Sequence, residues 1–125
     1  MNLLLDTHIV LWWLDDHPAL SSAVKNLIAN GRNLVLLSAA VVWEIRIKEA
    51  LGKLDIPSDF RRVLDRQPFE KLAIKVEHAH AVKDLPLHHR DPFDRMLIAQ
   101  AVTEGLTIAT HDPVFEKYSV PLIRG

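Results

Sequence analysis

Four acidic residues occupy positions where a charge is costly or where an element is expected to start: Asp6, Glu44, Asp94 and Asp112. Asp6 ends the apolar run Leu3-Leu4-Leu5, and Glu44 lies within Val41-Val42-Trp43-Glu44-Ile45. A lone carboxylate among apolar neighbours costs several kcal/mol unless a positive charge compensates it. Four carboxylates that folding brings together repel one another unless a divalent cation lies between them. The pattern therefore predicts a metal site.

The ligand type indicates which metal and which reaction to expect. Carboxylate oxygens suit hard cations such as Mg²⁺ or Mn²⁺ rather than zinc. The sequence has no cysteine, which excludes disulfides, thiolate catalysis and cysteine-based metal sites. An acidic pocket that holds one or two such ions can ionise a water molecule and stabilise charge on a phosphodiester. We therefore expect the chemistry of a metal-dependent nuclease.

Each acid also has a structural explanation. Asp6 can cap the helix that follows it, and Asp112 before Pro113 fits a helix N-cap. Asp94, at the third position of its predicted helix, can complete a cap or favour the helix dipole. Glu44 can pair with Lys48 one turn later, a contact worth only ~0.3–0.5 kcal/mol. Because its helix is apolar on nearly all sides, Glu44 is the acid that structure alone explains worst.

The elements that must position these acids alternate between strands and helices. Strands are predicted at Asn2 to Leu5, Leu34 to Leu37, Phe69 to Ile74, Leu106 to Ala109 and Val120 to Ile123. Helices are predicted at Ile9 to Leu14, Ala39 to Leu51, Pro57 to Arg66, Val76 to Lys83 and Pro92 to Glu104, with a helical turn at Pro113 to Lys117. A further helix, which Ser21-Ser22 can cap, is predicted to run through Ala29.

Local signals fix several of these boundaries. Ser38 is a good N-cap for the third helix, and Gly52 provides its end. Asp91 followed by Pro92 is a strong helix start, so we expect a capping or supporting role for Asp91. The alternation predicts a three-layer α/β/α sandwich around a mainly parallel sheet of four to five strands. Ligands of such sheets bind at the carboxyl ends of the strands, where the four acids can converge.

Length and composition bound the function. The 125 residues predict one domain covering residues 1–125, with no repeat and no linker. The net charge of −1 gives no overall electrostatic case for binding nucleic acid, so any such contact needs a local basic rim. The N-terminus lacks a signal-peptide pattern, and the apolar stretch Leu34 to Trp43 is too short to span a bilayer. We expect a soluble cytoplasmic protein with no membrane contact.

The seven histidines give weaker signals. His78 and His80 are two positions apart on a predicted helix and therefore point in different directions. The run His88-His89-Arg90-Asp91 resembles part of a kinase catalytic loop, but the chain is too short and has no glycine-rich loop. We interpret it as a polar loop before a capped helix. His8 is compatible with the mouth of the site and equally with a solvated loop.

Aromatic and basic residues complete the set of candidates. The tryptophans lie on predicted helices beside apolar residues, so we expect them to pack in the core: Trp12, Trp13 and Trp43. Basic residues that flank the acids in sequence form a candidate rim for the phosphates of a nucleic acid: Arg46, Lys48, Lys53, Arg90 and Arg95. A purely solvating role is an equal alternative for each of them.

Five segments together resemble the PIN domain, and within it the VapC-like toxins of type II toxin–antitoxin systems. They are Leu3-Leu4-Leu5-Asp6-Thr7-His8, Ser38 with Trp43-Glu44-Ile45 and Lys48, Gly52-Lys53-Leu54, the run from His89 to Ala101 that contains Asp91-Pro92-Phe93-Asp94, and Thr110-His111-Asp112 followed by Tyr118. The resemblance extends over essentially the whole chain.

The resemblance implies specific roles. Asp6, Glu44, Asp94 and Asp112 match the metal-binding acids of the family, and none is missing. Thr7 and Thr110 match its supporting hydroxyl positions; Ser38 and Asp91 are further supporting candidates. Such proteins are Mg²⁺-dependent ribonucleases in which Mn²⁺ is expected to substitute. They form homodimers and are inhibited by a cognate antitoxin, which also provides the contact with DNA.

Two other functions remain open at this stage. One is a non-catalytic PIN-like module that binds RNA or protein, with the acids acting as helix caps. The other is a phosphoryl-accepting receiver domain, which has a similar sheet and an acidic Mg²⁺ site. A receiver normally has paired acids after the first strand and an aspartate after the middle strand. Here Asp6 is single, and Ser38 follows the second strand, so the receiver is the weaker alternative.

Overall fold

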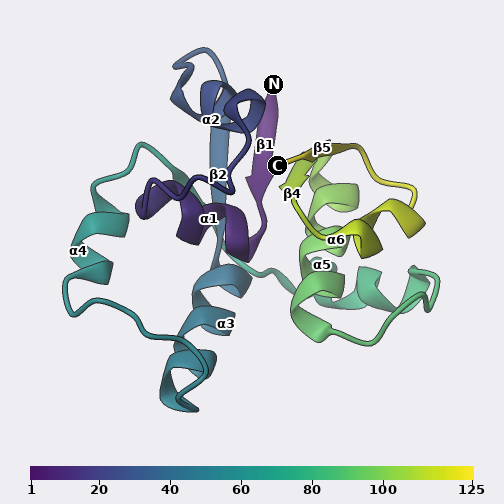
Figure 1. Cartoon of the computed structure of the whole chain (residues 1–125). Helices are drawn as coiled ribbons and strands as arrows, with labels where there is room; N and C mark the ends of the chain where they lie inside the picture. The colour runs from purple at the N-terminus through teal and green to yellow at the C-terminus, as the bar shows by residue number, and fades with distance from the viewer.

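The central feature of the fold is a five-stranded, all-parallel sheet with the strand order β3-β2-β1-β4-β5. The computed structural model describes all 125 residues (Figure 1). The strands are β1 (Asn2–Leu5), β2 (Leu34–Ser38), β3 (Glu70–Leu72), β4 (Thr107–Thr110) and β5 (Leu122–Arg124). The predicted parallel α/β architecture is confirmed. A receiver-type sheet has the order 2-1-3-4-5, so the strand order argues against that alternative.

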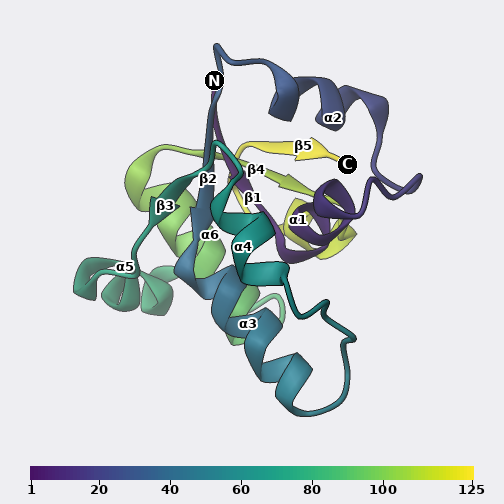
Figure 2. The ribbon, with the colours of Figure 1, turned by 90° about the vertical axis from the view of Figure 1, so that its left-hand side faces the viewer.

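Six α-helices and two short 3₁₀ helices connect the strands. They are α1 (Thr7–Leu14), α2 (Ser22–Ala29), α3 (Ala39–Ala50), α4 (Phe60–Asp65), α5 (Val76–Ala81), η1 (Val82–Asp84), α6 (Pro92–Glu104) and η2 (Pro113–Lys117). Figure 2 shows α1 and α2 on one side of the sheet and α5 and α6 on the other. The helices therefore form the two outer layers of the expected sandwich. None of them has the length and apolar character that crossing a bilayer requires.

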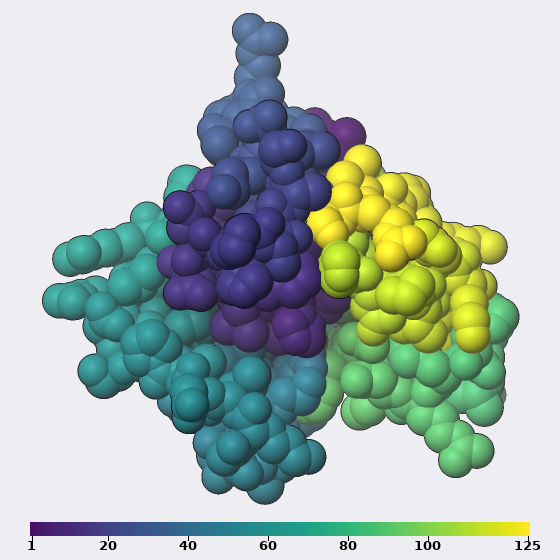
Figure 3. Space-filling view, viewed as in Figure 1, coloured from purple at the N-terminus to yellow at the C-terminus, as the bar shows by residue number.

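β1 is the centre of the core because it pairs with β2 on one side and β4 on the other. Leu3, Leu4 and Leu5 are completely buried, as expected for a parallel strand covered on both faces. The C-terminus closes one side of this core. Gly125 donates its N–H to the carbonyl of Thr110 and lies against Ile9, and Figure 3 shows the C-terminal residues in yellow against the N-terminal region.

Helix capping accounts for two shifted boundaries. α1 begins at Thr7 rather than Ile9, because the Asp6 carboxylate accepts the Thr7 N–H directly. β4 begins at Thr107 rather than Leu106. Gly105 ends α6 with a left-handed backbone (φ 69°), and the Leu106 N–H bonds back to the Ala101 carbonyl at 2.9 Å.

The outer elements are shorter than predicted. β3 has three residues instead of the span Phe69 to Ile74, and β5 is shifted to Leu122–Arg124. Both are edge strands, which have a pairing partner on only one side. The predicted helix from Pro57 starts at Phe60, whose N–H instead closes a turn on the Pro57 carbonyl. The predicted helix from Val76 is divided into α5 and η1.

A buried polar contact joins the end of β2 to α6 and to the residue after β3. The Ser38 hydroxyl caps α3 by accepting the Ala40 N–H at 3.0 Å and donates to Gln100 Oε1 on α6 at 2.6 Å. Gln100 in turn donates to the Ala73 carbonyl. Ser38 contacts no carboxylate, which corrects the expectation that it supports the acidic residues. Its polar group holds α6 against the end of β2.

Replacing this hydroxyl tests that assignment. Ser38→Ala should lower the free energy of unfolding by about 1–3 kcal/mol, because it removes a helix cap and leaves a buried amide oxygen without a donor. Chemical denaturation measures the change, and Ser22→Ala, at an exposed position of α2, should remain within about 0.5 kcal/mol of the unmodified protein. Unchanged stability combined with lost Mn²⁺ binding would instead place Ser38 in the metal site.

Candidate metal centre

Asp6 and Asp112 come together because β1 and β4 are parallel neighbours. Leu5 pairs with Ala109, and the Asp6 N–H extends the pairing by donating to the Ala109 carbonyl at 2.9 Å. Both strands therefore end at the same edge of the sheet. Asp6 and Asp112 line one cavity of about 510 Å³, together with His8, Trp12, His111, Pro113 and Arg124.

The Thr110 hydroxyl connects these two acids. It donates to Asp6 Oδ2 at 2.7 Å and accepts the Asp112 N–H at 3.1 Å. Asp6 Oδ1 accepts the Thr7 N–H at 2.7 Å. The Asp112 side chain accepts the Val114 N–H and so caps η2. The capping roles expected for Asp6 and Asp112 are confirmed, and the same geometry holds both carboxylates at the cavity.

Glu44 is held at the same edge of the sheet by Thr7, the residue that follows Asp6. The Thr7 hydroxyl donates to Glu44 Oε1 at 2.7 Å, and Lys48 Nζ lies 2.5 Å from Glu44 Oε2. Glu44 is only 5% exposed, so this is a buried carboxylate with a compensating cation, not a solvated surface pair. The predicted i,i+4 contact exists, and it supplies the partner that a buried glutamate requires.

Asp94 approaches the other acids from α6. Asp91 caps that helix by accepting the Phe93 and Asp94 N–H groups at 2.9 and 3.0 Å, which confirms its predicted capping role. The Asp94 carboxylate is therefore fixed in the first turn of the helix. Its Oδ2 lies 3.0 Å from His89 Nε2. The sequence predicts only a polar loop at His89, so this contact with Asp94 is not among its expectations.

The electrostatics show that the acids influence one another. Burial raises the pKa of Asp94 from 3.8 to about 8, and repulsion from Asp6, Asp91, Glu44 and Asp112 adds to the shift. Burial also raises the pKa of Asp6, against the lowering effect of the hydrogen bonds from Thr110 and Thr7. The hydrogen bond to Glu44 also raises the pKa of the Lys48 ammonium group, and for this cation the shift favours the charged form. Negative charge is thus concentrated beyond what the local cations neutralise.

This charge excess is the observation that fits a divalent cation. The donors are all carboxylate oxygens, the set that Mg²⁺ and Mn²⁺ prefer. No three of the four acids offer oxygens that all lie within 4.8 Å of one another. The acids therefore do not form a closed ligand shell, and only Asp6 and Asp112 line the cavity. Their role as metal ligands stays a prediction.

A tighter cluster elsewhere meets the 4.8 Å distance between ligand atoms, but its side chains already have partners within the chain. Glu77, His78 and Glu104 offer atoms within 4.8 Å of one another. His78 Nδ1 accepts the Lys75 N–H, so Nε2 carries the proton that it shares with Glu104 at 2.8 Å. The Lys75 ammonium lies within 4.0 Å of both carboxylates. Every group in this cluster is already compensated within the chain, which indicates a structural role.

The candidate basic rim is smaller than predicted. Arg95 is only 8% exposed, and its guanidinium donates to the carbonyls of Pro86, Val82 and Leu85. Its assignment to the rim is wrong, because a buried and fully bonded guanidinium cannot reach an RNA phosphate. Lys48 is directed at Glu44, whereas Arg46 and Arg90 are exposed. Arg46 bonds to Glu49 and lies over the Phe60 ring.

Core packing is confirmed for two of the three tryptophans, since Trp12 and Trp13 pack, partly buried, against the core. Trp43 is 56% exposed and packs edge-on against Phe93, with 5.0 Å between ring centroids; the prediction is wrong for this residue. Trp13 is part-buried and donates its indole N–H to Gln67. Trp12 lies at the acidic cavity, in ring contact with His8, His17 and His111.

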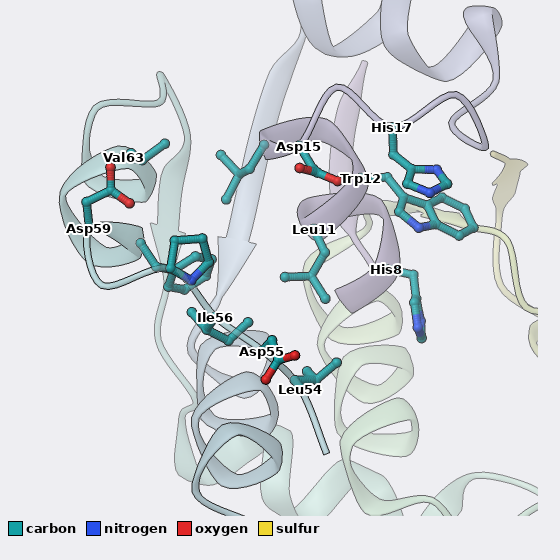
Figure 4. Close-up of a pocket in the computed structure, with 13 residues that line it drawn as sticks. His8, Leu11, Trp12, Asp15, His17, Leu54, Asp55, Ile56, Asp59 and Val63 are labelled. Carbon is teal, nitrogen blue, oxygen red and sulfur yellow. The ribbon is translucent and has the colours of Figure 1, made fainter. Parts of the chain in front are cut away.

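A second cavity, of about 580 Å³, adjoins the acidic one and shares His8 and Trp12 with it. Figure 4 shows its lining between α1 and the segment that leads into α4. The floor is apolar, with Leu11, Leu54, Ile56, Phe60 and Val63 among its residues. Its charged side chains are all acidic: Asp15, Asp55 and Asp59. This composition disfavours a nucleic-acid backbone and suits apolar and basic side chains.

Comparisons with known proteins agree with this architecture. The family model described as the PIN domain matches residues 3–121. A search of curated proteins found no match. Similar solved structures include VapBC2 from Rickettsia felis bound to a promoter DNA fragment (TM-score 0.76, 18% identity, covering 99% of this chain and 98% of that chain).

Two further structures show the same likeness. They are DNA-bound VapBC from Salmonella typhimurium (TM-score 0.69, 15% identity, 99% and 98% coverage) and FitAcB from Neisseria gonorrhoeae (TM-score 0.66, 22% identity, 97% and 96% coverage). At such identities the likeness establishes the fold and leaves activity to the chemistry of the site.

The raised pKa of Asp94 leads to a prediction about pH. A carboxyl group with a pKa higher in the folded than in the unfolded chain stabilises the fold below the unfolded value, and this contribution is lost as pH rises through the folded value. Without divalent ions, the free energy of unfolding should therefore fall between about pH 4 and pH 8 more steeply than in Asp94→Asn. Saturating Mn²⁺ should oppose the fall, because ligation requires the ionised carboxylate.

Denaturation series at several pH values, with EDTA and with Mn²⁺, measure these slopes. Parallel pH profiles for the unmodified protein and Asp94→Asn would show that Asp94 does not hold a proton in the folded state.

Proposed function

The chain belongs to the PIN domain family, and from that premise we propose that it is a divalent-metal-dependent endoribonuclease. The observation that carries the proposal is the convergence of Asp6, Glu44, Asp94 and Asp112 from four elements on one edge of the sheet, where the other acids help to raise the pKa of Asp94. Helix capping accounts for Asp6 and Asp112 singly. It does not account for concentrating four carboxylates in one place.

The four acids would hold Mg²⁺, or Mn²⁺ in its place. When bound, such an ion lowers the pKa of water and stabilises charge on a phosphodiester. The chain's own residues prepare this site. Thr110 and the Thr7 N–H fix both oxygens of Asp6, while the Thr7 hydroxyl fixes Glu44. Burial and the neighbouring acids raise the pKa of Asp94 to about 8, so a metal ion competes with a proton for this carboxyl group.

RNA is the substrate that the family resemblance favours. With a net charge of −1, the chain cannot attract RNA over its whole surface. Contact with phosphates would depend on the exposed rim residues Arg46 and Arg90, together with the ion itself. Lys48 contributes through Glu44, with which it forms an ion pair.

We also infer that the chain is the toxin of a toxin–antitoxin pair and works as a homodimer. The similar structures from Rickettsia felis and Salmonella typhimurium are VapBC proteins bound to DNA. The cavity beside the acids supports a protein inhibitor, because its apolar floor and acidic rim complement apolar and basic side chains. Contact with DNA would be made by the antitoxin, in agreement with the low net charge of this chain.

A non-catalytic PIN-like module remains the second candidate. It is favoured by one observation, the Lys48–Glu44 pair, since a buried acid compensated within the chain has less need of a metal. The two functions differ in a measurable property. A module whose acids only cap helices should show no saturable Mn²⁺ binding.

Replacing single ligands should separate these functions. Asp94→Asn and Asp6→Asn should each reduce Mg²⁺-dependent RNA cleavage by at least ~100-fold, the upper end of the loss seen when residues that only support a metal ligand are changed. Gel assays with a structured RNA pool measure the loss. Asp16→Asn is the matched control, since Asp16 is 86% exposed in its side chain and its positive φ of 46° suits asparagine.

The proposal fails if purified protein leaves RNA intact with either Mg²⁺ or Mn²⁺. It also fails if Asp94→Asn cleaves as fast as Asp16→Asn, because the activity would then come from a contaminant or from another site.

A further inference from the structure

A chain of hydrogen bonds leads from Asp94 into the protein interior through His89, Tyr118 and Arg95. We propose that His89 is a positioning residue that directs the Asp94 carboxylate toward the metal, and that Tyr118 and Arg95 fix the tautomer and orientation of its ring. This inference rests on the proposed metal site and adds residues that the acidic pattern does not include.

The geometry of the chain is continuous. His89 Nε2 lies 3.0 Å from Asp94 Oδ2, and His89 Nδ1 lies 2.7 Å from the Tyr118 hydroxyl. The same hydroxyl accepts a hydrogen bond from Arg95 Nη1 at 3.1 Å. Tyr118 follows η2, whereas His89 precedes α6 and Arg95 lies within it. The chain therefore connects two segments that are far apart in sequence.

One arrangement of protons gives every donor in this chain an acceptor. A guanidinium has only N–H donors, so the Tyr118 oxygen is the acceptor in the contact with Arg95. The hydroxyl proton of Tyr118 is then free to point at His89 Nδ1. A ring that accepts at Nδ1 carries its proton at Nε2, which faces the Asp94 carboxylate. Each donor in the chain thus meets an acceptor, and the donor at its end points at Asp94.

The far end of the chain is firmly anchored. Arg95 and Tyr118 are 8% and 5% exposed. The guanidinium also donates to the carbonyl of Pro86 at 2.8 Å and to that of Val82 at 3.2 Å. Two rigid side chains therefore set the position of the His89 ring. A histidine in a solvated loop would have no such fixed position.

In this arrangement one oxygen of the Asp94 carboxylate is hydrogen-bonded to His89, and the other is available to bind a metal ion. Oδ2 is engaged by His89, whereas Oδ1 makes no hydrogen bond within the chain. Hydrogen bonds of this kind orient ligating carboxylates, and their removal typically costs roughly 10–100-fold in metal affinity. Glu44 and Asp6 receive equivalent support from Thr7 and Thr110. His89 thus supplies for Asp94 the hydrogen-bond donor that threonines supply for its neighbours.

Mn²⁺ binding and histidine tautomers test the role directly. By calorimetry without RNA, His89→Ala should bind Mn²⁺ roughly 10–100-fold more weakly than the unmodified protein. His89→Gln, which retains an N–H donor, should recover part of the affinity. His80→Ala, which removes an exposed histidine of α5, is the control and should bind normally.

Long-range ¹H–¹⁵N spectra should show His89 protonated at Nε2, and Tyr118→Phe should weaken that preference.

Equal Mn²⁺ affinity of His89→Ala and His80→Ala would overturn the proposal, and so would a ring protonated at Nδ1. If only the thermal stability of His89→Ala falls, the residue holds the loop and nothing more. Absence of Mn²⁺ binding in the unmodified protein would overturn both the metal site and this role. If Mn²⁺ affinities change as expected but no variant cleaves RNA, the ribonuclease proposal fails and the positioning role stands.

Discussion

Mutual repulsion among carboxylates at one edge of the sheet is the constraint to which the rest of the site responds. Asp6 and Glu44 are almost fully buried, and each is stabilised by a threonine hydroxyl. Lys48 neutralises Glu44, but no cation lies against Asp6, and the remaining repulsion contributes to the raised pKa of Asp94. Such crowding is costly in an isolated chain, and a divalent cation would relieve it. The caps, hydroxyls and histidine around the acids hold this costly arrangement in place.

The parallel sheet makes the crowding possible. β1 lies between β2 and β4, and its apolar residues are covered on both faces, so polar groups are confined to the strand ends. Parallel pairing places the ends of β1 and β4 side by side, and the start of α6 brings Asp94 to the same place. Thr110 shows how closely the fold and the site are joined, because one hydroxyl orients Asp6 and receives the backbone of Asp112.

Features encoded by neighbouring residues could be predicted from the sequence, and features that depend on distant contacts could not. Asp91-Pro92 and Gly105 mark both ends of α6 correctly, since capping is local. The parallel sheet followed from the alternation of apolar runs and helices. Arg95 was misplaced on the surface because its carbonyl partners come from the loop before α6, and Trp43 was misplaced in the core because helix periodicity does not reveal which face is covered. The same reason applies to His89, because its partner Tyr118 follows η2 and is not a neighbour in sequence.

The location of a bound Mn²⁺ ion tests the central claim most directly. Crystals soaked with Mn²⁺ and measured at the manganese absorption edge would show the ion as an anomalous peak. The proposed site predicts a peak among the carboxylates of Asp6, Glu44, Asp94 and Asp112, near the carboxyl ends of β1 and β4. A peak at the compact cluster of Glu77, His78 and Glu104 instead, or no ordered peak at millimolar Mn²⁺, would contradict a metal centre built by the four acids.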